Sequence, residues 1–285
     1  MSKICIIFDR LRSEEKMLQK EALNLDHESI LLDAKSIQFN TDSKLDEYDF
    51  GNIIFQRCIS YFRGLHFTAC LEFFDCPVIN KFEVARKCGN KLFLSLLLKK
   101  HGVPTPKTYF SFSADAAREN FDKVGYPLVI KPVIGSWGRG VMVLKDKDAV
   151  DAVFELRELS DGTHDRIFYL QELVKRPPRD LRVITVGDRA IAGMYRKSTG
   201  GFKTNIALGA EPEICEITNE LEDICVKASQ AVGGGILGVD LMEDEKKGLL
   251  VHEVNNTVEF KGLAKVAKKN IPKEMIEFAV NSIRK

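Results

Sequence analysis

The residues whose types and spacing most directly suggest chemistry are Asp240, Glu253 and Asn255. They fall within two apolar runs, Leu237–Met242 and Leu249–Asn255, which the pattern predicts as the strands of a hairpin. If the hairpin turns at the lysine pair between the runs, Asp240 lies opposite Glu253 and Asn255 shares their face. Carboxylates on one face of apolar strands repel each other unless a cation joins them, and oxygen ligands suit Mg²⁺. The pattern therefore predicts a magnesium site, against the alternative of a solvent-facing polar hairpin.

A glycine-rich segment lies between two predicted strands, Tyr126–Lys131 and Val141–Leu144. Its glycines allow backbone N–H groups to approach phosphate oxygens, and Lys131 can reach the same anion from the end of its strand. The segment is not a Walker A loop, because no Lys-Ser/Thr pair ends it and no helix follows. A plain hairpin turn is the alternative. The predicted phosphate-binding residues of the segment are Gly135, Ser136, Trp137, Gly138, Arg139 and Gly140.

Cationic residues gather between these two features. Arg182 falls inside an apolar strand run, where an inward guanidinium requires an anionic partner, and Arg196 ends another strand. Arginines at strand ends suit planar recognition of carboxylate or phosphoryl oxygens. A solvated surface charge is the alternative for each alone, but with the predicted metal set they indicate phosphoryl transfer. The group comprises Arg179, Arg182, Arg196, Lys197, Lys203 and Asn205.

Other kinds of site are excluded by their patterns. Gly233–Gly238 satisfies Gly-x-Gly-x-x-Gly, but it follows a predicted helix and precedes a strand, so we interpret it as a helix C-cap and turn. The turn after the first predicted strand, Asp9–Arg12, has no glycine, so the Rossmann dinucleotide-binding fingerprint is absent where it would be expected. The sequence also has no Gly-x-Ser-x-Gly elbow, so a serine hydrolase has little support. The histidines lack metalloprotease spacing. His252 and Glu253 are neighbours on a strand, so their side chains are expected to diverge.

The elements that must position these residues begin with alternating strand and helix signals in the first 80 residues. Such alternation favours an open, mostly parallel sheet. The predicted strands are Ile4–Asp9, Ser29–Leu32, Ile53–Gln56 and Val78–Asn80, and the predicted helices are Glu14–Leu23 and Leu65–Phe74.

The rest of the chain combines helices with antiparallel strand signals. Asn219–Val232 is an amphipathic helix with Asn219 as its expected N-cap and Glu222 three residues later. A flexible loop is expected at Leu159–Asp165. The other predicted elements are helices at Asn90–Lys100 and Val150–Leu159 and strands at Phe168–Val174, Leu181–Val186 and Ala190–Tyr195. These patterns predict three lobes, residues 1–88, 89–167 and 168–285.

Length and composition bound the class of protein. A chain of 285 residues corresponds to two or three domains. Its 45% hydrophobic content provides a core, and its net charge of +1 excludes attraction of the whole surface to nucleic acid or lipid. No run is long enough to span a membrane, and residues 1–9 are too short for a signal peptide. Seven cysteines without a Cys-x-x-Cys pair favour reduced thiols in a cytoplasmic protein.

Taken in order, the motifs resemble those of ATP-grasp ligases, in the branch that contains RimK and LysX. Each motif is weak alone, but the ordered set is specific and covers essentially the whole chain. The segments that carry the resemblance are Lys91, Gly102–Pro106, Val129–Pro132, Gly135–Gly140, Gln171–Val174, Asp180–Arg182, Asn205–Gly209, Val239–Asp240 and His252–Asn255.

The resemblance implies an α/β fold with α+β lobes: an N-terminal open parallel sheet and two lobes that clasp ATP. Within the branch, Gly135–Arg139 and Asn256–Gly262 resemble the ligases that act on LysW, a small acidic carrier protein. This implies joining the γ-carboxyl of the carrier's C-terminal glutamate to the amine of glutamate or 2-aminoadipate, in an enzyme that is a homodimer or homotetramer. A RimK-type ligase that adds glutamate to another tail, and a nucleotide-binding module without catalysis, are the alternatives.

The resemblance also implies a role for individual residues. Lys91 and Lys131 would contact ATP phosphates under the Gly135–Gly140 lid. Asp240, Glu253 and Asn255 would hold Mg²⁺. Arg182 and Asn205 would steady an acyl-phosphate, and Arg196 would touch the amino acid. The remaining nucleotide-binding positions are Gln171, Glu172, Val174, Lys175 and Asp180, and the remaining substrate-binding positions are Asn256, Thr257, Glu259 and Phe260.

Overall fold

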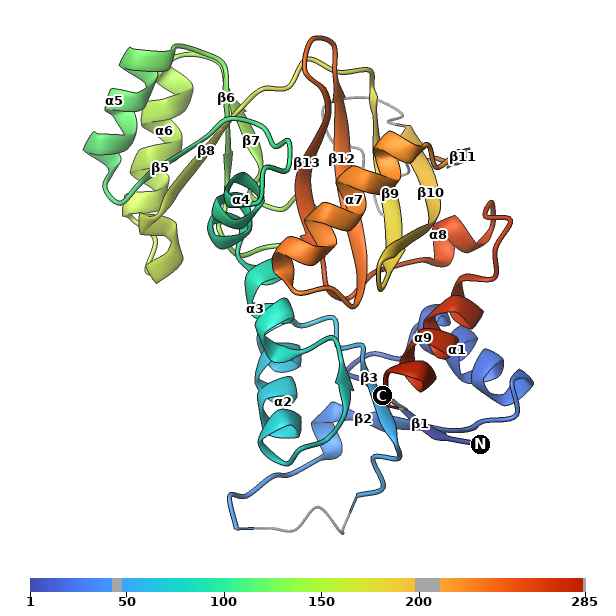
Figure 1. Ribbon diagram of the computed structural model, residues 1–285. Coiled ribbons are helices and arrows are strands. Elements are labelled where there is room, and N and C mark those ends of the chain that lie inside the picture. Colours follow the sequence, from blue (N-terminus) through green and yellow to red (C-terminus); the bar gives the residue numbers. More distant parts are fainter. Residues whose placement is uncertain (43–47, 198–210, 284–285) are drawn as a thin grey trace.

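The computed structural model describes residues 1–42, 48–197 and 211–283, which form three sheets with helices packed against them (Figure 1). Each sheet is formed by one continuous stretch of the chain. Among the described residues, no helix is both long enough and apolar enough to cross a membrane.

The N-terminal sheet is parallel, with the strand order β2-β1-β3-β4. Both faces are buried because alternate side chains of β1 point to opposite sides: Ile4 and Ile6 pack with α1, whereas Cys5 and Ile7 pack with α2. This confirms the open parallel sheet predicted from the alternating pattern. The elements are β1 (Lys3–Phe8), α1 (Ser13–Asn24), β2 (Glu28–Asp33), η1 (Ala34–Ser36), β3 (Ile53–Gln56), α2 (Tyr61–Phe73) and β4 (Val78–Ile79).

The middle sheet is antiparallel, with the order β5-β8-β6-β7, and two helices cover one of its faces around a core of its own. Its fourth strand, β8, pairs with β5 and β6, so this sheet extends past the boundary predicted at residue 167. A short 3-10 helix lies inside the stretch expected to be a flexible loop. The elements are β5 (Thr108–Ser111), α5 (Ala114–Val124), β6 (Leu128–Lys131), β7 (Met142–Leu144), α6 (Lys147–Glu158), η3 (Thr163–Arg166) and β8 (Phe168–Glu172).

The C-terminal sheet is also antiparallel, with the order β11-β10-β9-β12-β13. One face packs on α7 together with α3 and α4, which precede the middle sheet in the chain. Part of the other face, together with the segment after β13, packs against the N-terminal domain. The elements are α3 (Phe82–Gly89), α4 (Lys91–Lys100), β9 (Arg179–Val186), β10 (Arg189–Lys197), β11 (Glu211–Cys215), α7 (Asn219–Val232), β12 (Ile236–Asp244), β13 (Gly248–Asn255), α8 (Lys261–Ala264) and α9 (Ile271–Ser282).

Local capping explains where two of these helices begin. The Asn90 side chain accepts hydrogen bonds from the backbone N–H groups of Leu92 and Phe93, which places Lys91 at the first position of α4. For α7 the predicted N-cap is one residue off: the Thr218 hydroxyl, not Asn219, accepts from the backbone of the first turn. The Gly233 backbone (φ 118°) caps the other end of α7, which confirms that its glycines are a helix terminus.

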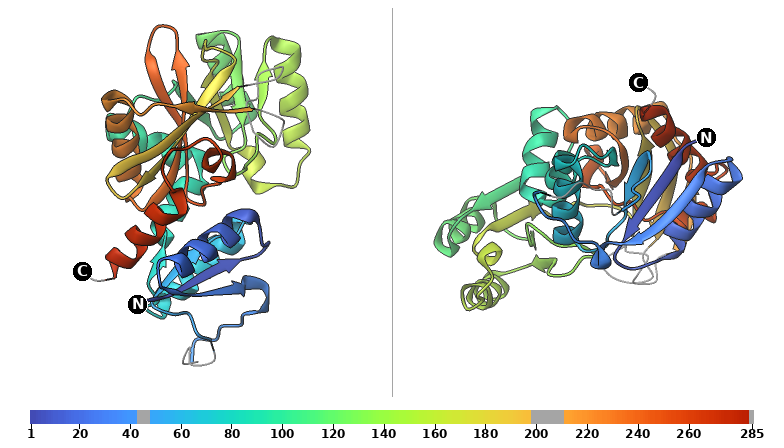
Figure 2. Two further views of the ribbon diagram at one scale, coloured as in Figure 1. Left: turned by 90° about the vertical axis from the view of Figure 1, so that its right-hand side faces the viewer. Right: turned by 90° about the horizontal axis from the view of Figure 1, so that it is seen from below.

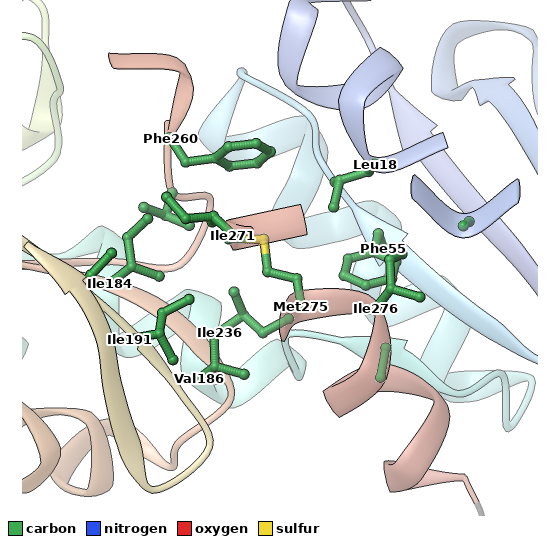
Figure 3. Close-up of a cluster of buried hydrophobic side chains, with 14 of the residues drawn as sticks. Leu18, Phe55, Ile184, Val186, Ile191, Ile236, Phe260, Ile271, Met275 and Ile276 are labelled. Atoms are coloured by element: carbon green, nitrogen blue, oxygen red, sulfur yellow. The ribbon is translucent and has the colours of Figure 1, made fainter. Parts of the chain in front are cut away.

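The N-terminal domain and the C-terminal sheet share one hydrophobic core. Leu18 of α1 and Phe55 of β3 meet Ile184 of β9, Phe260, and Met275 of α9 in a single buried cluster (Figure 3). Helix α9 therefore returns the end of the chain to the N-terminal domain, where it lies beside α1 (Figures 1 and 2). Burial of this cluster joins the two parts into one packed unit.

Candidate active site

Two adjoining cavities lie where the three sheets meet. The larger has a volume of about 630 Å³ and is lined by all three parts of the chain, with Arg12 and Tyr61 from the N-terminal domain and Arg182 from β9 among its walls. The smaller, of about 80 Å³, extends between the glycine-rich segment and β13. Lys91, Glu253 and the start of the glycine-rich segment line both cavities, so the two form one continuous cleft.

The predicted carboxylate pair lies on the wall of this cleft. Asp240 of β12 is paired directly with Glu253 of β13, which confirms the expected pair. A β-bulge brings the two together, since the regular register of this hairpin, with Leu241 opposite Val251, would place His252 opposite Asp240. Asp240 is 2% exposed. Its carboxylate accepts two hydrogen bonds of 2.7 Å from the Arg182 guanidinium and one of 3.4 Å from the Asn255 amide, and the Arg196 guanidinium lies 3.2 Å away. Burial alone would raise the pKa of Asp240, but the two arginines outweigh it and keep the carboxylate ionised.

This donor set fits a divalent cation. Asp240, Glu253 and Asn255 all line the larger cavity, and their oxygens are the kind of ligand that Mg²⁺ takes. In the described part of the chain no three His, Cys, Asp or Glu residues gather as a metal cluster, and the third member of this set is an amide. The Lys91 ammonium lies 3.4 Å from the Glu253 carboxylate and donates to the Gly135 carbonyl at 2.6 Å. The lysine thus joins the acidic wall to the glycine-rich segment.

Lys131 lies on the opposite wall, at the end of β6. It is 6% exposed, and its ammonium donates to the Gln171 amide oxygen at 2.6 Å. Burial lowers its pKa to about 8, with Lys91 and Arg176 adding to the effect. Gln171, one of the expected nucleotide contacts, therefore orients the lysine in this structure.

The glycine-rich segment is both a hairpin connection and a cleft wall. It joins β6 to β7, as the alternative of a hairpin turn predicts. Its residues Gly135, Ser136 and Trp137 also line both cavities. Gly138 and Gly140 have φ values of 67° and 68°, a conformation that glycine adopts without strain. The Arg139 guanidinium lies 5.3 Å from the centre of the Trp137 ring.

The cationic group divides into buried and surface members. Arg196 donates to Asp180 at 2.6 and 2.9 Å, so Asp180, another expected nucleotide contact, holds the arginine in place. Burial would lower the pKa of Arg196, but Asp240 and Asp180 raise it, so the guanidinium stays charged. Arg179 instead binds Glu243, away from the cleft lining. Lys197 pairs with a partly exposed glutamate on β11. Asn205 and Lys203 lie outside the described residues.

The predicted adenine-side residues follow β8. Glu172 accepts from the Lys107 backbone and binds the Lys247 ammonium. Val174 is buried in a small apolar cluster with Met242 and Leu250. Lys175 lies 3.8 Å from Glu245 at the exposed edge. Met242 also lines the smaller cavity, so the apolar cluster borders the cleft.

His252 contradicts the sequence interpretation. Asp240 pairs with Glu253 but Leu241 pairs with Val251, so His252 is the extra residue of a β-bulge. Val251 and Val254 both pack in the core beneath α7, which leaves His252 and Glu253 together on the cleft side, where both line the smaller cavity. The prediction that their side chains diverge is therefore wrong. Burial and the Lys131 cation lower the pKa of His252, so its ring is neutral. Among the described residues, its Nε2 has no hydrogen-bond partner.

The segment Asn256–Gly262, called the 256–262 turn below, corrects another expectation. Asn256, Thr257 and Glu259 line the larger cavity, as a substrate contact requires. Phe260 does not, because its ring is fully buried in the core shared with the N-terminal domain. The expected contact of Phe260 with substrate is therefore wrong, and its role is to support the turn from behind.

Sequence reasoning missed the contribution of the N-terminal domain. Arg12, which follows β1, and Ser60 and Tyr61, which follow β3, all line the larger cavity. They lie beyond the carboxyl ends of parallel strands, where open α/β sheets bind ligands. The signal in the sequence is the position of these residues, since each directly follows one of the strands predicted for the parallel sheet.

A cleft between two antiparallel sheets, with the buried Lys131 on one wall and a carboxylate pair on the other, defines an ATP-grasp protein. The chain belongs to the RimK-like ATP-grasp family of ligases: the family model described as a RimK-like ATP-grasp domain matches residues 88–279, and one described as a LysX preATP-grasp domain matches residues 4–87. The ATP-grasp fold implied by the sequence motifs is thus confirmed. Ligases of this fold use ATP.

Two relatives match almost the whole chain. The α-aminoadipate–LysW ligase LysX of Sulfurisphaera tokodaii is 38% identical, over 98% of this chain and 99% of that protein. The glutamate–LysW ligase ArgX of Sulfolobus acidocaldarius is 30% identical, over 98% and 99%. Among solved structures, a RimK domain ATP-grasp protein from Sphaerobacter thermophilus superposes with a TM-score of 0.77 at 21% identity, covering 98% of this chain and 99% of that one. That likeness supports the fold.

Proposed function

We propose that this protein is an ATP-dependent ligase that forms an isopeptide bond between the γ-carboxyl of the C-terminal glutamate of a LysW-type carrier and the α-amino group of glutamate, 2-aminoadipate or both. The reaction would belong to arginine or lysine biosynthesis. The observation that carries the proposal is the match along nearly the full length of both LysX and ArgX, the two relatives named for these reactions. The cleft supports it, because Lys91, Lys131 and the carboxylate set all line it.

The residues in the cleft account for the first half of such a reaction. A carrier carboxylate oxygen would attack the γ-phosphorus of ATP, forming an acyl-phosphate and releasing ADP. Lys91 and Lys131 would contact the phosphates, and Arg182 would offset the negative charge that accumulates between the two anions. Asp240, Glu253 and Asn255 would hold Mg²⁺, which when bound supplies further neutralisation of phosphate charge. The adenine would lie toward Glu172, Val174 and Lys175.

The second half needs an amine at the acyl carbon. The α-amino group of the amino acid would attack that carbon, phosphate would leave, and the proton of the amine would pass to solvent or phosphate. Arg196 and the 256–262 turn would contact the amino acid, with Asn205 beside the acyl-phosphate. The glycine-rich segment would cover the cleft and limit access of water. No protein nucleophile is needed.

The choice of amino acid is the open part of the proposal. Glutamate and 2-aminoadipate differ by one methylene, which a pocket discriminates by only about 1–3 kcal/mol. The larger cavity, at about 630 Å³, has room for either beside a carrier tail. We therefore propose use of both, with the ratio set by the cavity wall.

The test is an assay with ATP, Mg²⁺, LysW and both amino acids in competition, read by intact mass of the carrier. The expected result is two carrier adducts, separated by the mass of one methylene. A single adduct rejects dual use. If LysW gains no mass while a peptide ending in glutamate is extended, the protein is a RimK-type ligase. If ATP binds but neither acceptor consumes it, the ligase assignment fails.

The remaining parts of the proposal concern organisation. Residues 1–88, 89–167 and 168–285 would form the preATP-grasp domain, the central lobe and the C-terminal lobe. Seven cysteines without a disulfide fit the reducing cytoplasm. Assembly as a homodimer or homotetramer is tested by light scattering of the purified protein.

A further inference from the structure

The 256–262 turn has two distinct sides. Thr257, Glu259 and Lys261 line the larger cavity. Val258 and Phe260, which alternate with them, are fully buried in the core shared with the N-terminal domain. The side chains that face the cleft are therefore presented by a backbone whose other side is covered by the N-terminal domain.

Buried N-terminal side chains bind the backbone of this turn directly. The Arg57 guanidinium donates to the Val258 carbonyl at 2.9 Å, and the Asn80 amide donates to the Asn256 carbonyl at 2.7 Å. A weaker contact joins the Lys261 backbone N–H to the Glu14 carboxylate at 3.3 Å. Two alternate carbonyls and one amide of the same short segment are thus held by another domain.

Arg57 is itself held in one orientation. It is 4% exposed; its Nε donates to Glu15, which is fully buried, and its guanidinium lies 5.7 Å from the centre of the Phe260 ring. Glu15 also binds Arg12, whose guanidinium reaches the Glu259 side chain at 3.3 Å. A buried ion pair is seldom retained for stability alone, because apolar residues of similar volume serve a core as well. The directed hydrogen bond to the turn is what an apolar pair could not supply.

Asn80 makes a second fixed link. Its side chain accepts from the Ile236 backbone N–H at 2.8 Å and donates to the Ile236 carbonyl at 2.7 Å, in addition to its bond to Asn256. It therefore joins the start of β12, which carries Asp240, to the residue that follows Asn255. It thus fixes the first residue of the turn relative to the start of β12.

We propose that Arg57 and Asn80 of the N-terminal domain are positioning residues for the amino-acid substrate, because they hold the 256–262 turn whose Thr257 and Glu259 face it. This inference rests on the proposed function, in which the turn contacts the amino acid. It assigns the N-terminal domain a part in acceptor affinity and in the choice between glutamate and 2-aminoadipate. Neither residue lines the two cavities of the cleft.

Arg57→Lys and Asn80→Asp test the inference with little change of volume. Lysine keeps the charge beside Glu15 but loses the fork that reaches Val258, and aspartate keeps the acceptor for Ile236 but loses both donors. Because displacement of a substrate-holding group by about 1 Å can reduce rate a hundredfold, we expect KM for the amino acid to rise about tenfold to a hundredfold. KM for ATP should stay within about twofold, and the glutamate to 2-aminoadipate ratio of kcat/KM should change.

Arg157→Lys is a matched control. Arg157 is also buried, donates to two backbone carbonyls, of Asp165 and Ile167, and lies 5.3 Å from the Phe168 ring. It belongs to α6, which packs on the middle sheet, and lines neither cavity. Its substitution should lower thermal stability about as much as Arg57→Lys. A merely structural role of Arg57 predicts the same kinetics for both variants.

The outcomes separate the inference from the function on which it rests. A selective rise in KM for the amino acid in folded Arg57→Lys or Asn80→Asp supports the inference. Equal changes in the KM values for ATP and amino acid, or the same changes in Arg157→Lys, overturn it while the wild-type carrier adduct still supports the function. If Arg57→Lys does not fold, Asn80→Asp decides alone. A wild-type protein that forms no LysW adduct overturns the function and the inference together.

Discussion

The C-terminal sheet meets its two neighbours in different ways. Against the N-terminal domain it buries a continuous apolar cluster that includes Ile184, Met194, Phe260 and Met275. Toward the middle sheet, the apolar contact in the described residues is the small group of Val174, Met242 and Leu250, beside the ion pair of Lys247 with Glu172. Apolar burial stabilises in proportion to area, whereas partly exposed ion pairs contribute little.

The difference separates two tasks of the cleft. Under the proposed function, the amino-acid side is built on the packed boundary and would hold its geometry before substrate arrives. The nucleotide side is closed mainly by polar contacts, so opening it to admit ATP would cost little free energy, and the bound nucleotide would supply the remaining contacts. The middle sheet has a separate core around Phe121, Phe154 and Phe168, which would allow it to move as one rigid body. Four predictions test this contrast.

The largest effect is expected at the packed boundary. Phe260→Ala removes a fully buried ring from the shared core and should lower the free energy of unfolding by about 3–5 kcal/mol. Because the core is shared, urea unfolding should remain one transition for the N-terminal domain and the C-terminal sheet. The control is Leu159→Ala, whose side chain is 76% exposed and should change stability by less than about 0.5 kcal/mol. Two separate transitions in the wild type would contradict the shared core.

A smaller effect is expected in the apolar group at the nucleotide side. Met242 is 8% exposed and has few apolar partners. The substitution Met242→Ala should therefore lower the free energy of unfolding by about 2 kcal/mol, at the low end of the range for a buried methionine changed to alanine. Since Met242 lines the smaller cavity, KM for ATP should rise while KM for the amino acid stays unchanged. Calorimetry of unfolding and initial rates measure the two effects. An equal loss of amino-acid affinity would show that the two sides are not independent.

The next effect depends on pH. The pKa of Lys131 is lowered to about 8, so above that pH the ammonium loses its proton and the phosphates lose a cation. Apparent ATP affinity should fall by at most tenfold, or about 1.4 kcal/mol, per pH unit above 8. Without nucleotide the sign is opposite: the unfolded chain binds more protons between pH 8 and 10.5, so this group makes stability rise with pH there. KM for ATP measured from pH 7 to 9.5 tests the first statement.

Lys131→Arg is the control for this titration, because a guanidinium keeps its charge throughout that range. Its KM for ATP should be flatter with pH, whatever its value at pH 7. A wild-type profile without a change near pH 8 would contradict the assignment of Lys131 to the phosphates. KM for the amino acid should show no inflection from this group.

The smallest effect is expected for the ion pair across the cleft. Lys247 binds Glu172, with side chains 50% and 24% exposed, so Lys247→Ala should change the free energy of unfolding by less than about 1 kcal/mol. The effect should shrink further at high salt. Lys123→Ala, which breaks an exposed pair within α5, is the comparison. A loss of several kcal/mol would mean that ion pairs, and not packing, hold the two lobes together.

Much of the framework could be predicted from local patterns. The hairpin pattern predicted the pair Asp240 and Glu253, although a bulge and not plain alternation brings the two together, and the apolar pattern predicted the helix that carries Lys91. The errors are also local in origin. A bulge adds a single residue that alternation does not reveal, so His252 was placed on the wrong face. Thr218 and Asn219 are both good capping residues, and their sequence alone does not choose between them.

The sequence by itself determined the order of elements and placed Asp240 and Glu253 on the two strands of one hairpin, because these follow from contacts between near neighbours in the chain. Only the tertiary structure decided the bulge in that hairpin and which side chains point into the cleft. Arg57 and Val258 are joined by a hydrogen bond across 201 residues, and Phe260 is buried by a domain that begins at the other end of the chain. Contacts of that separation depend on how whole elements pack, which no local pattern encodes.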